Sequence, residues 1–182
     1  QIFMNVGNNT FVDASVSSGI TANGGFYDGR AGISWAVAAV DVDGDSDVDV
    51  IFADDQGAIV PARNCPGAPP GSACLDRALL HVFINDGAGR CTDYPVDNTP
   101  YAANEWMGLA FGDLNCDDRM DFFASSFGDY ANRFFGVNYI AGSSNSRWFL
   151  GNGDGTFADV GVGALESTPF GWGAAVFDYD ND

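Results

Sequence analysis

The sequence predicts an all-β protein built of propeller-type blades that form a partial or open propeller. Three observations indicate this fold: many aspartates without lysine, abundant glycine, and an internal repeat of strand-like runs. Of the 25 acidic residues 23 are Asp, the 7 basic residues are all Arg, and 24 residues are Gly. Asp favours turns, caps and metal loops, whereas Glu and Lys are typical of solvated helix faces. The composition therefore disfavours a helical bundle.

The first element of the repeat is a β-hairpin that occurs three times. Each copy has an apolar run, a turn of Gly, Asn and Asp residues, and a second run, at residues 2–13, 82–93 and 148–159. These turn residues tolerate the positive φ angles that tight hairpins need. We therefore expect two antiparallel strands in each of these segments.

The second element follows each hairpin after a variable stretch. It is an apolar run that leads into an acidic loop, at residues 35–40, 107–112 and 172–177. A further apolar run follows each of the first two loops, at 50–53 and 122–124, and predicts a buried strand. Four short strands per unit of roughly 60 residues describe a propeller blade better than a sandwich, because a sandwich does not repeat its sequence.

We expect one repeat domain over residues 1–182. Its units are residues 1–56, 79–130 and 131–182, the last of them truncated in its acidic loop, with an insertion at 57–78. An aligned position carries Trp35, Met107 and Trp172, which we interpret as packing between blades, the alternative being an aromatic platform for a sugar.

The four cysteines suit an oxidising compartment. Cys65 and Cys74 lie in the proline-rich insertion, where a disulfide would close a loop of about ten residues and stabilise it by roughly 2.5 to 3 kcal/mol. For Cys91 and Cys116 two alternatives stay open, a second disulfide or two buried thiols.

The acidic loops are the strongest chemical signal in the chain. Their spacing, Asp-x-Asp-x-Asp-x-x-x-Asp, suits a cation held by side-chain oxygens at positions 1, 3, 5 and 9 and a backbone carbonyl at 7. The first loop offers Asp41, Asp43, Asp45 and Asp49 with the carbonyl of Asp47. The second loop offers Asp113, Asn115, Asp117 and Asp121 with the carbonyl of Arg119. The third loop has Asp178, Asp180 and Asp182 at positions 1, 3 and 5, and we expect it to need more chain or another molecule.

Oxygen-only ligands in a tolerant geometry favour Ca²⁺, since Zn²⁺ prefers His or Cys and Mg²⁺ prefers fewer carboxylates. The loops are not EF-hands, because position 12 carries no Glu and the flanks are apolar runs. The alternative is a solvated acidic turn. Recurrence at the same place in each unit favours a cation, and so does the repulsion between crowded carboxylates that nothing neutralises.

At these residues the chain resembles the FG-GAP/VCBS repeat family, which includes the integrin α-subunit propeller and proteins similar to cartilage acidic protein. The resemblance is carried by the hairpin Phe-x-Asn-x-Gly-x-x-x-Phe-x-Asp of residues 3–13 and by the loop 41–49. It implies β-propeller blades with Ca²⁺ in an inter-strand loop, in extracellular adhesion or matrix proteins. The family commonly has Gly at loop position 6, where this chain has Ser46 and Asp118.

These features favour a secreted or cell-surface, non-enzymatic, calcium-stabilised module for adhesion or assembly. Copies would pack head to tail into a filament, or the chain would be part of a longer propeller. The formal charge of −18 disfavours nucleic acid as a partner, and no run approaches the ~20 apolar residues of a membrane span.

Two other functions are alternatives. Glycan binding would use stacking rings among Trp106, Tyr101, Tyr130 and Trp148. An enzyme such as a polysaccharide lyase or hydrolase is disfavoured by the single His81, which we expect to be a half-buried structural residue, and by the lack of Lys. Asn8 begins an N-glycosylation sequon in a hairpin turn, so a glycan there is a further prediction.

Overall fold

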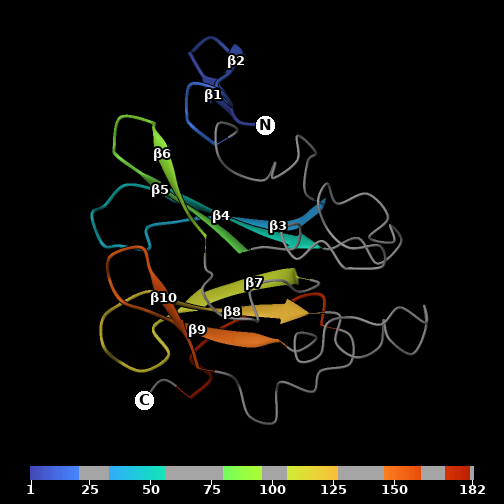
Figure 1. The fold of residues 1–182 in the computed structure, drawn as a ribbon, viewed down its shortest axis with the longest axis vertical. Coiled ribbons are helices and arrows are strands. Elements are labelled where there is room, and N and C mark those ends of the chain that lie inside the picture. The colour runs from blue at the N-terminus through green and yellow to red at the C-terminus, as the bar shows by residue number, and fades with distance from the viewer. Residues whose placement is uncertain (21–32, 56–79, 96–105, 127–145, 161–170, 181–182) are drawn as a thin grey trace, which may run out of the picture.

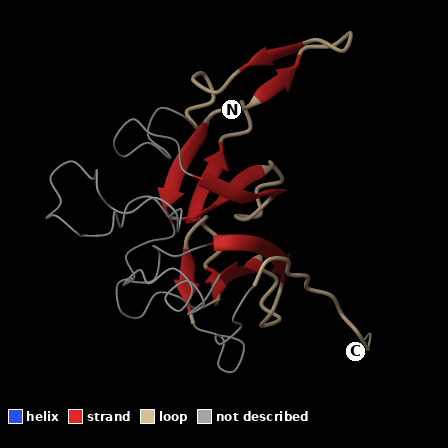
Figure 2. Ribbon diagram, turned by 90° about the vertical axis from the view of Figure 1, so that its right-hand side faces the viewer, coloured by secondary structure: helices blue, strands red, loops and turns tan. Residues whose placement is uncertain are grey.

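The computed structural model describes residues 1–20, 33–55, 80–95, 106–126, 146–160 and 171–180. These residues form ten β-strands and no helix, and every strand pairs antiparallel with its neighbours (Figures 1 and 2). The strands are β1 (Phe3–Asn5), β2 (Phe11–Asp13), β3 (Ile33–Val40), β4 (Asp49–Asp55), β5 (Leu80–Asn85), β6 (Cys91–Pro95), β7 (Trp106–Gly112), β8 (Asp121–Ser126), β9 (Arg147–Gly151) and β10 (Phe157–Asp159). The predicted all-β fold is confirmed.

The three predicted hairpins are β1–β2, β5–β6 and β9–β10, and the apolar runs after the first two acidic loops lie in β4 and β8. The strands form two four-stranded sheets, in the orders β3-β4-β5-β6 and β7-β8-β9-β10, and one separate hairpin, β1–β2. Each four-stranded sheet joins the strand pair of one sequence unit to the hairpin of the next. The sheets are therefore offset by half a unit from the sequence repeat, and they have the open, propeller-type form of blades.

The core lies between the two four-stranded sheets, which pack face to face (Figure 1). Strand β7 lies against β3 and β4. Alternate residues of β4 and β5 point into this layer, because successive side chains of a strand face opposite sides of its sheet. The buried cluster contains Val42, Ile51, Ala53, Leu80, Val82, Trp106, Phe122, Ala124 and Phe149.

The apolar run of the third unit lies across β7 and β8, on the face away from the first sheet. The amide of Gly171 donates a hydrogen bond to the carbonyl of Ser126 (3.0 Å), and the Ser125 hydroxyl donates to the carbonyl of Trp172 (3.2 Å). Gly108 of β7 permits this approach, because a Cβ added there would lie 2.1 Å from the Trp172 carbonyl oxygen.

Replacing Gly108 with alanine is expected to lower the free energy of unfolding by about 1 to 3 kcal/mol, because the added methyl group overlaps backbone that cannot give way. Chemical denaturation measures the change. Gly173→Ala is the matched control, since a Cβ there would have no atom within 4 Å. Equal stability of the two variants would show that residues 171–173 do not pack on β7.

The aligned residues Trp35, Met107 and Trp172 have different environments. The rings of Trp35 and Trp172 meet edge to face, with centroids 5.3 Å apart, which joins β3 of the first unit to the third unit. Met107 is buried, whereas both Trp side chains remain about half exposed. The Trp pair thus makes the packing between units that the repeat predicts.

Cys91 and Cys116 are free thiols, so neither of the two alternatives for them is found. Cys91 begins β6 in one sheet and is half-buried, whereas Cys116 is exposed in the loop between β7 and β8 of the other sheet. Their positions on different blades explain why they do not pair, and burial raises the pKa of the Cys91 thiol. Cys65, Cys74 and the rest of the insertion lie outside the described residues.

Candidate metal centres

The first acidic loop joins β3 to β4 and curls around the side chain of Asp41. The amides of Gly44 and Ser46 donate hydrogen bonds to its two carboxylate oxygens, at 2.8 and 2.9 Å. Both donors have positive φ angles, 81° for Gly44 and 75° for Ser46. This backbone conformation explains why glycine suits loop position 6, since L side chains are strained there.

Asp49, at position 9, is fully buried and joins the loop to the next sequence unit. Its Oδ2 accepts a hydrogen bond from the amide of Val42 (2.9 Å), and its Oδ1 accepts one from the amide of Asn85 at the end of β5 (2.8 Å). The Asn85 side-chain amide donates to the carbonyl of Val48 (3.2 Å). Asp49 therefore fastens the hairpin β5–β6 to the loop, a role that the ligand spacing did not predict.

Three of the predicted ligands of this loop come together. One oxygen of each of Asp41, Asp43 and Asp49 lies within 4.8 Å of the others. Oxygens that share one Ca²⁺ at about 2.3 to 2.6 Å lie no more than about 5.2 Å apart, so the three carboxylates fit this ion. Each carboxylate also keeps lone pairs that its hydrogen bonds leave free. Asp45 is exposed and outside this group, and it accepts a hydrogen bond from the Asp47 amide (2.8 Å).

The electrostatics of this group favour a cation. Desolvation raises the pKa of Asp43, and the nearby carboxylates of Asp49, Asp45 and Asp41 raise it further, against a hydrogen bond from the Asp45 amide that lowers it. Negative charge at Asp43 is thus costly without a counter-ion. A bound divalent cation would remove this cost by attracting all the carboxylates at once.

The second loop, between β7 and β8, repeats this backbone. Cys116 and Asp118, at loop positions 4 and 6, have positive φ angles of 61° and 62°. The amides of Asp117 and Asp118 donate to Asp113, at 3.1 and 2.9 Å. Desolvation raises the pKa of Asp113, but the backbone donors, Asp118 first among them, outweigh it and hold the pKa below its usual value.

Asp121 occupies the place of Asp49. It is fully buried, and it accepts hydrogen bonds from the amides of Leu114 and Gly151, both at 2.8 Å. Asp117, at loop position 5, accepts hydrogen bonds from the Asn115 side-chain amide (3.1 Å) and the Arg119 backbone amide (3.0 Å). Within the described ranges, the carboxylates of this loop are not gathered as those of the first loop are.

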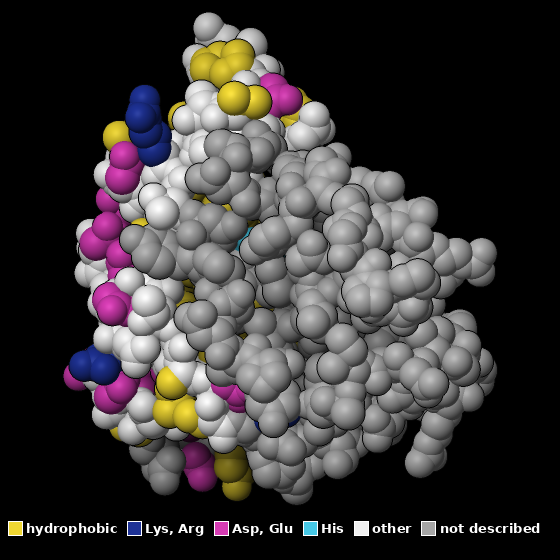
Figure 3. All heavy atoms as spheres, viewed as in Figure 1, with side chains coloured by type: hydrophobic (Ala, Val, Ile, Leu, Met, Phe, Trp, Pro, Cys, Tyr) yellow, Lys and Arg dark blue, Asp and Glu magenta, His cyan; other side chains and the backbone are white. Residues whose placement is uncertain are grey.

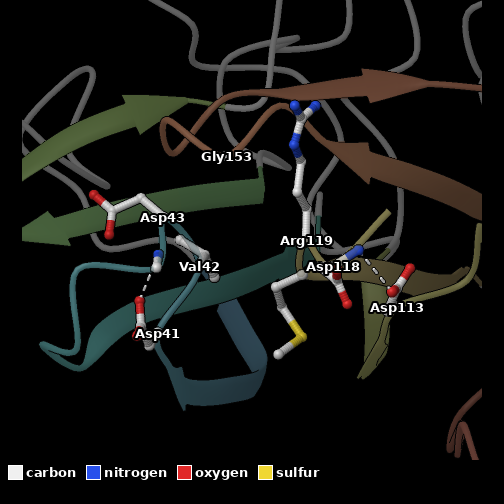
Figure 4. A pocket seen from close by; sticks show the side chains of 9 residues that line it. Asp41, Val42, Asp43, Asp113, Asp118, Arg119 and Gly153 are labelled. Atoms are coloured by element: carbon white, nitrogen blue, oxygen red, sulfur yellow. Dashed lines mark hydrogen bonds between the residues drawn. The ribbon is translucent and has the colours of Figure 1, made fainter. Parts of the chain in front are cut away.

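The two loops face a common cavity of about 300 Å³ (Figure 4). Its acidic lining residues are Asp41 and Asp43 from the first loop and Asp113 and Asp118 from the second. Arg119 is the positively charged residue of the lining, and Gly153 lies beside its side chain. The lining is thus negative overall, which favours cations in the space between the blades.

The third loop is described as far as Asp180. Asp178 and Asp180 are exposed, and the Asp180 amide donates to Asp178 at 3.2 Å. Asp182 lies outside the described residues.

Trp106 and His81, which would serve a sugar site or a catalytic site, are buried. Trp106 has no exposed surface, so it is part of the core and offers no platform to a sugar. Trp148 is half-buried against Phe123, and Tyr101 and Tyr130 lie outside the described residues. His81 is more deeply buried than expected, stacked on Phe83 and 3.9 Å from Asp54. Asn8 is exposed in the turn between β1 and β2, and its glycosylation stays a prediction.

Strand–loop–strand units with acidic loops of one backbone conformation, in sheets that stack face to face, define a repeat protein with propeller-type blades. Residues 137–182 match the family model of the FG-GAP-like repeat. This match covers most of the third unit, including the hairpin β9–β10 and the third acidic loop, and confirms the resemblance there. No curated protein matches the chain. None of the described segments is a helix of the length and hydropathy that crossing a membrane requires.

Proposed function

We propose that this chain is a non-enzymatic, extracellular, calcium-binding module of β-propeller repeats that serves adhesion or self-assembly. The observation that carries the proposal is the convergence of Asp41, Asp43 and Asp49 in a loop whose backbone recurs at 113–121. The first loop would hold Ca²⁺ through these three residues together with Asp45 and the carbonyl of Asp47. In the second loop the ligands would be Asp113, Asn115, Asp117, Asp121 and the carbonyl of Arg119. Asp178, Asp180 and Asp182 would contribute to a third site.

Calcium acts by linkage in this proposal. An ion that binds the folded loops and not the unfolded chain shifts the folding equilibrium toward the folded state. The loops join β3 to β4 and β7 to β8, and their position 9 residues hold the following hairpins, so an ion in either loop stabilises a whole blade. Blades kept in register by calcium would suit a module that packs head to tail with other copies or with further blades.

Adding calcium is expected to raise the free energy of unfolding by about 1.4 to 2.7 kcal/mol per site, at concentrations of ~10 to 100 times the dissociation constant. Thermal denaturation with calcium, with magnesium and with chelator measures this effect. The variant Asp43→Asn should lose the contribution of the first loop, because it removes a charged ligand that makes few bonds of its own. A melting temperature that does not respond to calcium would contradict the proposal.

Self-assembly is tested separately by sedimentation of the chain at several concentrations with calcium and with chelator. Larger species that form with calcium and dissociate with chelator are expected. A monomer under all conditions would reject self-assembly and leave calcium binding intact.

A further inference from the structure

The three hairpins among the described residues close with the same backbone hydrogen bond. In each, the residue after the first strand donates its amide to the carbonyl four residues on, from Val6 to Thr10, from Asp86 to Arg90 and from Asn152 to Thr156, all at 2.9 Å. The residue just before the donor is therefore equivalent in the three hairpins. These residues are Asn5, Asn85 and Gly151, each at the end of the first strand.

In two hairpins the amide of this residue is held by a buried aspartate. Asn85 donates to Asp49, and Gly151 donates to Asp121, both at 2.8 Å. Each aspartate begins a strand, β4 or β8, that pairs with the hairpin. The residue that follows each aspartate lies opposite a phenylalanine, which is Phe83 in β5 and Phe149 in β9.

In the remaining hairpin, β1–β2, one edge of β1 has no paired strand among the described residues. The carbonyl of Ile2 accepts from Ala14 and the amide of Val6 donates to Thr10, so these residues face β2. Because bonding alternates along a strand, the amides of Phe3 and Asn5 face the other edge of β1. No strand pairs with this edge among the described residues, and the hairpin projects from one end of the molecule (Figures 1 and 2).

The equivalent phenylalanine side chains of the three hairpins also differ in exposure. Phe83 and Phe149 are 2% and 1% exposed, whereas the equivalent Phe3 is 56% exposed. Met4, Phe11 and Val12 of the same hairpin are also exposed, and hydrophobic side chains gather at this end of the molecule in Figure 3. A lone hairpin with apolar side chains in water is marginally stable, so a further strand would stabilise this one.

We propose that the open edge of β1 binds an extended strand that begins with aspartate and continues with apolar residues, from a further unit of the same repeat. The aspartate accepts the hydrogen bond of the Asn5 amide, and the next residue lies opposite Phe3. Strands β4 and β8 bind the other two hairpins in this way. Their sequences begin Asp-Val-Ile-Phe-Ala and Asp-Phe-Phe-Ala-Ser. Backbone pairing supplies affinity and the aspartate sets the register. The proposal rests on the assembly part of the proposed function, takes a strand of a further repeat unit and not a second copy as the occupant of this edge, and needs no calcium.

The test uses a labelled synthetic peptide with the sequence of β4, Asp49–Asp55, added to the whole chain in the presence of chelator. Fluorescence anisotropy should show saturable binding. A peptide with asparagine in place of its first aspartate should bind about tenfold more weakly, because a charge-assisted bond becomes a neutral one. In NMR spectra of methyl-labelled methionine, the signal of Met4 should shift, whereas the buried Met107 should not.

The variant Asn5→Pro removes the amide donor at a strand edge, where proline is tolerated, and should abolish binding. Equal binding of a scrambled peptide, or undiminished binding to Asn5→Pro, would overturn the proposal. Association of the chain with itself that shifts Met4 and excludes the peptide would also overturn it, because the occupant would then be a second copy. Chelator keeps the outcome separate from that of calcium binding.

Discussion

Replacing Phe122 with alanine is expected to lower the free energy of unfolding by about 3 to 5 kcal/mol. Phe122 has no exposed surface and belongs to the buried core cluster. Its ring stacks on Phe149 with centroids 4.7 Å apart and meets Phe157 edge to face at 4.8 Å. Alanine would remove these contacts and leave a cavity between strands that cannot move together freely. Urea denaturation followed by circular dichroism measures the loss.

The control is Phe177→Ala, which removes the same atoms from a side chain that is 75% exposed. Its effect should stay within about 0.5 kcal/mol, as is usual for surface substitutions. If the two variants were equally stable, the two sheets would not share the core around Phe122.

Replacing Asp49 with alanine is expected to cost about 2 to 4 kcal/mol in the presence of chelator. The change leaves the buried amide of Val42 and the part-buried amide of Asn85 without their acceptor. A buried donor without a partner costs about 1 to 3 kcal/mol, and the part-buried one costs less because water can reach it. The destabilisation should be greatest where the acidic loop contacts the hairpin β5–β6. Hydrogen exchange of the Asn85 amide reports it locally, and chemical denaturation reports the total.

Asp43→Ala separates this structural role from calcium binding. Asp43 belongs to the same acidic group, yet its hydrogen bond to the Asp45 amide is a long, exposed one of 3.3 Å. With chelator, Asp43→Ala should be close to neutral while Asp49→Ala is destabilised. With calcium, both variants should lose the stabilisation from the first loop. A neutral Asp49→Ala would mean that the buried carboxylate does not hold the hairpin.

The roles of Asp43 and Asp49 differ in the structure although the ligand spacing treats them alike. In the spacing, positions 1, 3, 5 and 9 are equivalent oxygen donors. In the structure, position 9 is buried between two amides, positions 1 and 3 lie near it, and position 5 is exposed. The same division recurs at Asp121, where Gly151 supplies the second amide. The signal available in the sequence was the aligned Asn or Gly at the end of the first strand of each hairpin.

The hairpins and the acidic loops were predictable because their causes are local. Positive φ angles at Gly7 and Gly87 are demanded by turns a few residues long, and alternation or continuity of apolar residues marks the strands on either side. The offset of the sheets from the repeat was not predictable in this way. Whether β5 pairs with β4 or with β7 depends on contacts across an insertion of unrelated sequence, and local propensity does not decide between such partners.

The sequence by itself therefore determined the strands, their turns, the acidic loops and the repeat that relates them, because each depends on backbone preferences within a few residues. The tertiary structure alone decided which unit supplies each hairpin, which carboxylates converge, and which thiols lie apart. It also placed Asp49 and Asp121 as the links between units. The physical reason is that burial and hydrogen bonding act between segments distant in the chain, so identical local patterns such as Phe3 and Phe83 acquire opposite environments.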